Sequence, residues 1–159
     1  MPNSERIAVG ARAPEFELKN QYGARVRLVV ECQRGPLVLF FFPNTGASGH
    51  ATEALAFAEA ANVFRAEGAR LFAISSDRVV RHAFLAVEHS LTFSLLSDPG
   101  GRVALRYGLA QTPPPRTVRM TYVIDRQGLV QHLFASDSHS YRHVASALEA
   151  VRHLVRGQS

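Results

Sequence analysis

Two side chains in this sequence are the first candidates for carrying chemistry, His50 and Cys32. His50 follows a short polar segment with two glycines, residues 44–49, and opens a stretch with helical periodicity. The N-terminus of a helix exposes unpaired N–H groups and the positive end of the helix dipole, so it attracts anions. The same field disfavours a protonated imidazole, because two positive charges would meet. We therefore expect His50 to be largely neutral at pH 7.

The elements that would position His50 run from residue 37 to residue 64. Residues 37–42 form an unbroken apolar run, which predicts a buried strand, and Pro43 would end it because proline cannot donate to a sheet ladder. Ser48 or Gly49 can then cap a helix. The apolar stripe of that helix has helical spacing and consists of Ala54, Phe57, Ala58, Ala61 and Phe64.

Cys32 is the only cysteine in the chain, so an intramolecular disulfide is excluded. It lies in the turn that leads into the predicted buried strand. We interpret it as a thiol without a redox task. The alternative, a reactive thiol, would require solvent exposure and a lowered pKa.

The remaining pattern alternates between strands and helices. A strand at 69–75 follows the strand and helix described above, which predicts a right-handed parallel βαβ unit. We expect Gly68 to end the first helix, and Ser76 or Asp77 to cap the next one. The other predicted elements are an N-terminal hairpin (Phe16 to Leu18 and 26–30), helices at 79–88, 101–107 and 141–155, an extended segment at 93–98, and a late hairpin (119–125 and 129–134).

Length and composition indicate one domain, residues 1–159, with an ordinary globular balance of 47% hydrophobic and 19% charged residues. The net charge of +5 comes from basic residues spread along the chain, so we expect no nucleic-acid partner. No apolar run approaches the length of a membrane span. Residues 1–10 lack an apolar signal region, so we expect a cytoplasmic protein without a membrane partner.

The stretch around Pro43 and His50 resembles the active-site segment of the peroxiredoxins, the AhpC/TSA family, of the bacterioferritin comigratory protein type. In that family a proline is followed four positions later by Thr or Ser and seven positions later by the peroxide-attacking cysteine. Many members of this type have a resolving cysteine five residues further on. In this sequence those three positions hold Ala47, His50 and Leu55.

The resemblance covers about residues 8–155 and implies an α/β, thioredoxin-like fold in its peroxiredoxin form, with a central mixed sheet flanked by helices and an N-terminal hairpin. It also implies that Arg119, at the start of a late strand, reaches the active-site pocket, and that Glu53 belongs to the same pocket. The matching pocket positions are therefore Pro43, Ala47, Gly49 and Glu53, with His50 and Arg119 as the candidate reactive pair.

Three functions are compatible with these substitutions. The first is a homologue without peroxidase activity, whose old pocket binds a small anion, a carboxylate or a partner. The second is an enzyme with new chemistry, in which His50 is a general base and Arg119 clamps an anion. The third is residual antioxidant activity as a thiol peroxidase, through Cys32 or another route. The resemblance implies no cofactor, and family members occur as monomers and dimers, so a homodimer is our expectation.

The other histidines show no spacing typical of a metal site, and we interpret each as a surface residue without a bound metal. They are His82, His89, His132, His139, His143 and His153.

Overall fold

The computed structural model describes residues 7–43, 52–109, 119–135 and 140–157. The strands are β1 (Glu17–Lys19), β2 (Arg25–Arg27), β3 (Leu37–Phe41), β4 (Arg70–Ser75), β5 (Ser94–Ser97), β6 (Met120–Ile124) and β7 (Val130–Ala135). The helices are α1 (Leu28–Cys32), α2 (Thr52–Ala66), α3 (Val79–His89), α4 (Arg102–Arg106) and α5 (Ser140–Gly157), with a 3-10 turn, η1 (Pro99–Gly101), before α4.

The seven strands form one mixed sheet in the order β2-β1-β5-β4-β3-β6-β7. Strand β3 is its centre, because it pairs in parallel with β4 on one side and antiparallel with β6 on the other. All five residues of β3 are buried, as the unbroken apolar run at 37–42 predicted. The predicted parallel βαβ unit is present as β3-α2-β4, and β5 extends it in parallel.

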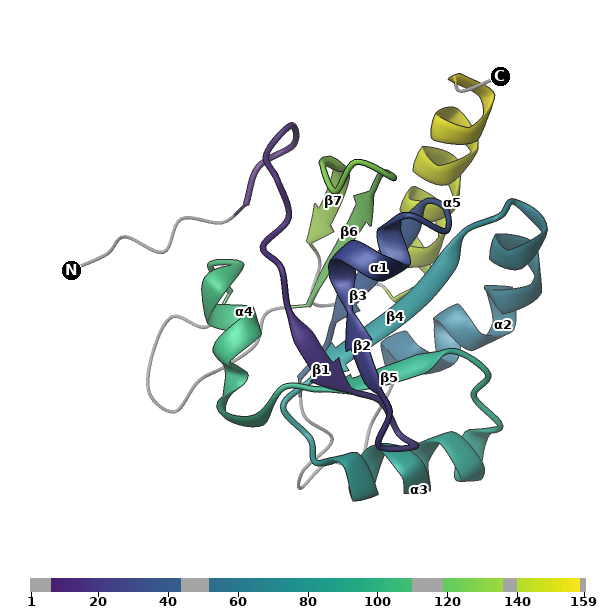
Figure 1. Cartoon of the computed structure of the whole chain (residues 1–159). Helices are drawn as coiled ribbons and strands as arrows, with labels where there is room; N and C mark the ends of the chain where they lie inside the picture. Colours follow the sequence, from purple (N-terminus) through teal and green to yellow (C-terminus); the bar gives the residue numbers. More distant parts are fainter. Residues whose placement is uncertain (1–6, 44–51, 110–118, 136–139, 158–159) are drawn as a thin grey trace.

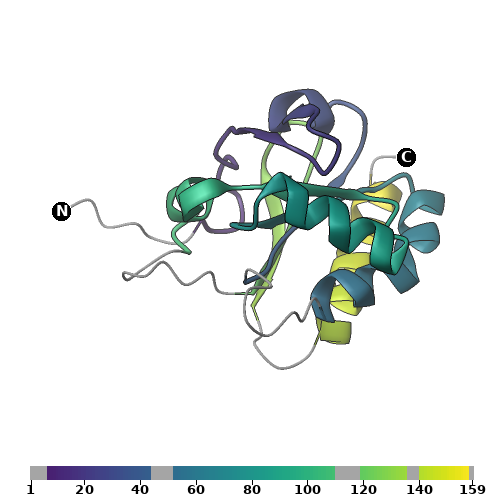
Figure 2. The same ribbon diagram turned by 90° about the horizontal axis from the view of Figure 1, so that it is seen from below.

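The two faces of the sheet carry separate hydrophobic cores, since alternate residues of a strand point to opposite faces. Leu37, Leu39 and Phe41 pack with residues of α1, α4 and the N-terminal segment. Val38 and Phe40 pack on the other face, with α2, α3 and α5. Helices α2 and α5 lie side by side (Figure 1), and α1 lies across the sheet from them (Figure 2).

The second strand of the N-terminal hairpin is shorter than the sequence predicted. Strand β2 ends at Arg27, and helix α1 begins at Leu28, so the strand predicted over 26–30 was partly wrong. The two valines Val29 and Val30 suggested a strand because β-branched residues favour one. In the fold, Leu28 and Cys32 are buried one helical turn apart, whereas both valines are exposed. Tertiary packing therefore decides the conformation of this segment.

Helix ends were predicted with mixed success. Gly68 and Gly108 follow α2 and α4 with positive φ of 79° and 76°, the left-handed geometry that favours glycine after a helix. The predicted cap of α3 was wrong. Arg78 occupies the cap position in an extended conformation, and no side chain makes a capping hydrogen bond there.

A buried carboxylate holds the start of α4. Asp98 is 1% exposed, and its two oxygens accept hydrogen bonds from the backbone N–H groups of Val103 and Ala104, each at 3.0 Å. These N–H groups belong to the first turn, where a helix cannot satisfy them internally. Asp98 therefore fixes η1 and α4 against the end of β5.

Replacing Asp98 with Ala should lower the free energy of unfolding by about 2–3 kcal/mol, because two buried N–H groups lose a charged acceptor. Urea unfolding followed by circular dichroism measures the change. Glu88→Ala, on the exposed surface of α3, is the matched control and should change it by less than about 0.5 kcal/mol. Equal stability of the two variants would contradict the role given to Asp98.

Candidate functional site

The first feature of the site is the edge of the sheet where β3 ends and β6 begins. Met120 pairs with Phe41, so Arg119 and Pro43 come to the same edge from two adjacent antiparallel strands. Both residues are half-buried. The structure thus brings together two sequence-predicted residues that are 76 positions apart in the chain. A guanidinium at the end of a buried sheet can meet an anion that approaches this edge.

Helix α2 begins at the same edge, because a short connection separates Pro43 from Thr52. Glu53 lies in its first turn, and Leu55 follows as a half-buried residue. The helix therefore directs its N-terminus, with unpaired N–H groups, toward the end of the sheet that carries Arg119. Three of the predicted residues, Ala47, Gly49 and His50, lie outside the described residues.

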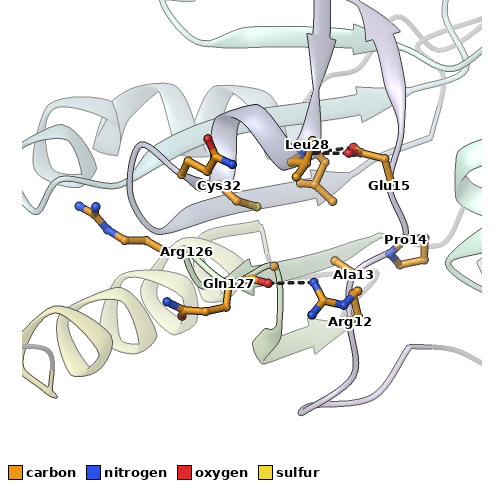
Figure 3. Close-up of a pocket in the computed structure, with 11 residues that line it drawn as sticks. Arg12, Ala13, Pro14, Glu15, Leu28, Cys32, Arg126 and Gln127 are labelled. Atoms are coloured by element: carbon orange, nitrogen blue, oxygen red, sulfur yellow. Dashed lines mark hydrogen bonds between the residues drawn. The ribbon is translucent and has the colours of Figure 1, made fainter.

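Cys32 lies at the opposite end of β3. It is the last residue of α1 and precedes the strand, whereas Pro43 follows it. The six residue-to-residue steps of extended chain from Leu37 to Pro43 span about 20 Å. Cys32 is 2% exposed, and burial raises the pKa of its thiol to about 11, with the carboxylates of Glu15, Asp125 and Glu31 adding to the shift. Its side chain lines a cavity between α1 and the β6–β7 turn (Figure 3).

Two histidines are buried, contrary to the expectation of surface positions. His82 is 0% exposed, and its Nε2 lies 2.7 Å from the Oγ of Ser75. His143 is 1% exposed, and its Nδ1 lies 2.8 Å from the Oγ1 of Thr121. The sequence contained a signal for both, because each histidine shares a helical stripe with buried apolar residues such as Leu85 and Ala147.

The Ser75–His82 pair belongs to a polar network at the carboxyl ends of β4 and β5. Ser75 Oγ also accepts a hydrogen bond from the N–H of Asp77, at 3.1 Å, and the Ser97 hydroxyl donates to the carbonyl of Asp77. The ring of His82 lies 6.2 Å from that of Phe42 at the end of β3. The network therefore supports the sheet edge at which Pro43 and Arg119 lie. Burial lowers the pKa of His82, although the charge of Asp77 opposes the shift.

The lowered pKa of His82 makes stability depend on pH. The folded state holds this histidine neutral, whereas the unfolded state binds a proton as the pH falls through 6.5, the ordinary value. We expect the free energy of unfolding to decrease between pH 7 and pH 5, by at most about 1.4 kcal/mol per pH unit for this one group. Urea unfolding at several pH values measures the slope.

A His82→Gln variant, which keeps a donor near Ser75, should have a shallower slope over the same pH range. Burial also lowers the pKa of the more exposed His132, so His132→Gln is the matched comparison, with a smaller effect. An unchanged slope in His82→Gln would contradict the assignment.

Metal and membrane sites were tested among the described residues. Within 7–43, 52–109, 119–135 and 140–157, no three His, Cys, Asp or Glu side chains gather in a group that could hold a metal ion. No helix in that part of the chain has the length and hydrophobicity that crossing a membrane requires.

Comparison with known proteins identifies the family. Residues 9–133, most of the chain, match the AhpC/TSA family. The chain belongs to this family, the peroxiredoxins. The chloroplastic peroxiredoxin Q of Triticum aestivum is 31% identical over 153 residues, which cover 94% of this chain and 69% of the relative.

Solved structures show the same relationship. The crystal structure of peroxidoxin BcpB from Mycobacterium tuberculosis is 32% identical, with a TM-score of 0.87 and coverage of 94% of this chain and 99% of that one. The bacterioferritin comigratory protein of Xanthomonas campestris, at 20% identity and a TM-score of 0.80 over 94% of this chain and 98% of that one, shares the fold. The predicted thioredoxin-like peroxiredoxin fold is confirmed. The roles of His50, Arg119 and the pocket positions in this peroxiredoxin stay predictions.

Proposed function

We propose that this peroxiredoxin has lost thiol peroxidase activity, and that its former active-site pocket binds a small anion such as a carboxylate. One observation carries the proposal: the only sulfur nucleophile in the chain, Cys32, is buried, has a raised pKa and lies at the wrong end of β3. The alignment of the active-site segment, with His50 at the position of the attacking cysteine, supports it from the sequence side.

Peroxide reduction requires a thiolate, which attacks one oxygen of the peroxide and becomes a sulfenic acid. With a pKa of about 11, only about one Cys32 thiol in ten thousand is ionised at pH 7. The side chain is also 2% exposed, so a peroxide has little access to it. Both factors oppose the third function considered from the sequence, a peroxidase that uses Cys32.

An imidazole at position 50 cannot substitute for the thiolate, because it has no comparable route to accept an oxygen and be regenerated by a thiol. Ala47 also lacks the hydroxyl that would hold a peroxide, and Leu55 lacks the resolving thiol. These substitutions affect three separate steps of the peroxidase cycle. A loss of the whole cycle accounts for all three together.

Anion binding does not require the three residues that peroxide reduction has lost, because it depends on other groups. The guanidinium of Arg119 and the N-terminus of α2 belong to the same edge of the sheet, next to Pro43. Both favour a negative charge, and a guanidinium can hold a carboxylate with two parallel hydrogen bonds. A neutral His50 would add a hydrogen-bond donor. Location in the cytoplasm and assembly as a homodimer are further parts of this proposal.

The peroxidase part is tested with hydrogen peroxide and either thioredoxin or dithiothreitol as reductant. We expect no consumption above that of boiled protein, because no accessible thiolate is present. The double variant Ala47→Thr, His50→Cys restores the hydroxyl and the thiol, and should consume peroxide measurably faster than the parent chain. Thiol-dependent turnover by the parent chain above that of boiled protein would overturn the proposal, whether or not Cys32→Ser abolishes it.

The binding part is tested by titrating acetate and monitoring the side-chain Nε–H resonance of Arg119 by NMR. We expect a saturable shift that is weakened in His50→Ala. In Arg119→Ala, the backbone amides of α2 should no longer respond. Arg78→Ala, at the start of α3, is the matched control and should bind as the parent does.

A linear, non-saturating response equal in all variants would contradict an anion site. If acetate binds, esters and amides of small carboxylic acids can be assayed for turnover. Turnover that is lost in His50→Ala would favour the second function, general-base catalysis by His50.

A further inference from the structure

A second cavity lies at the opposite end of the sheet from Arg119, between α1, the N-terminal segment and the β6–β7 turn (Figure 3). Its volume of about 520 Å³ lies within the range typical of small-molecule sites. All the residues that line it belong to the described part of the chain. We refer to it as the α1 pocket.

The floor of the α1 pocket is apolar and belongs to the hydrophobic core. Leu28, Cys32 and Ala13 form it, with exposed fractions of 3%, 2% and 5%. Val29 also lines the pocket and is 46% exposed. An apolar ligand body would pack on the floor and would remove mainly the surface of Val29 from water.

The opposite rim carries positive charge. Arg12 and Arg126 lie on the side of the β6–β7 turn (Figure 3). Arg12 donates a hydrogen bond to the carbonyl of Gln127 at 3.0 Å, and among the described residues neither arginine forms an ion pair with a carboxylate. Both guanidinium groups therefore keep donors for a ligand.

The single acidic residue of the pocket is already engaged. The Glu15 carboxylate accepts hydrogen bonds from the backbone N–H groups of Phe16 and Val29, at 2.9 and 3.1 Å. It lies beside Leu28 on the α1 side (Figure 3). The carboxylate thus faces the N-terminal turn of α1, away from the arginine side of the rim. Its charge still acts on the Cys32 thiol at the floor, so a ligand carboxylate is expected at the arginines and not at the floor.

The wall that carries Arg12 is built before any ligand binds. Backbone hydrogen bonds join Ala13 N–H to the carbonyl of Gly128 at 2.9 Å, and Val130 N–H to the carbonyl of Ala11 at 2.9 Å. Asp125 holds the turn itself, because its carboxylate accepts from the N–H groups of Gln127 and Leu129. A site with fixed walls loses little entropy when it binds a ligand.

We propose that the α1 pocket binds an organic monoanion with an apolar body, such as a medium-chain aliphatic carboxylate. The carboxylate lies on the arginine side of the rim, where the charges of Arg12 and Arg126 favour it, and the apolar body lies on Leu28, Cys32 and Ala13. This site is separate from the anion pocket at Arg119, which lies at the other end of β3, so the two proposals stand or fail independently.

Octanoate is a suitable probe, with acetate as the probe without an apolar body and 1-octanol as the probe without a charge. Titration followed by amide NMR should show saturable binding of octanoate, with a dissociation constant of about 1 mM or tighter, and shifts centred on Ala13, Val29, Cys32 and Gly128. Acetate should leave these amides unchanged. Equal affinity for 1-octanol would contradict the role of the arginines, and octanoate shifts centred on Arg119 alone would contradict the site.

The single cysteine gives an independent readout at the pocket floor. Saturating octanoate should slow the alkylation of Cys32 by iodoacetamide at pH 9 at least about threefold, because a thiol that is 2% exposed reacts only when the pocket opens locally, and a bound ligand stabilises the closed state. An unchanged rate in the presence of bound octanoate would overturn the proposal. Mass spectrometry measures the rate of alkylation directly, because the chain contains no other thiol that could react.

Two pairs of variants separate binding from folding. Arg126→Gln should weaken octanoate binding about fivefold, since it removes an exposed charge, whereas Arg78→Gln should not change it. Val29→Trp should fill the mouth and abolish binding, whereas Val30→Trp, one residue further along α1 and outside the pocket, should bind as the parent does. Equal loss in both members of either pair would contradict the proposal.

Discussion

The structure depends on the pairing of β3 with β4 on one side and β6 on the other. This strand is buried along its whole length, so its backbone groups are satisfied only by its two neighbours. The parallel pairing with β4 requires α2 as a crossover, and the antiparallel pairing with β6 brings Arg119 back to the end of β3. One central strand therefore fixes the helix N-terminus and the guanidinium at the same edge of the sheet.

The two ends of β3 differ in chemistry because they differ in solvation and charge. The carboxyl end has a helix N-terminus, Arg119 and a polar network around Ser75 and His82, which suit an anion. The amino end has Cys32 among apolar side chains and carboxylates, which suppress a thiolate. A thiol in these surroundings is buried and largely protonated, and it is the only thiol that the chain contains.

Two buried polar pairs support the face of the sheet that α2, α3 and α5 cover. Ser75–His82 lies under α3, and Thr121–His143 lies under α5, where the ring of His143 meets that of Phe134 edge-on at 4.8 Å between centroids. In each pair the hydrogen bond between hydroxyl and imidazole gives a buried side-chain oxygen a partner, which offsets the cost of burying it. The helices that carry them are thereby fixed in rotation against the strands.

The sequence by itself determined the buried strand at 37–42, the βαβ unit and the late hairpin, because hydrophobic period and turn residues act locally, and its resemblance to the peroxiredoxins implied the fold class. It did not determine α1, because the exposed Val29 and Val30 favoured a strand. It also did not determine the burial of His82 and His143, because histidine is a polar residue and was assigned to the surface. The resemblance implied that Pro43 and Arg119 share a pocket. Only the tertiary structure decided the strand register, with Met120 beside Phe41, that brings both residues to one edge of the sheet, and the burial of Cys32 at the other end of β3, because register and packing join residues that are distant in the chain.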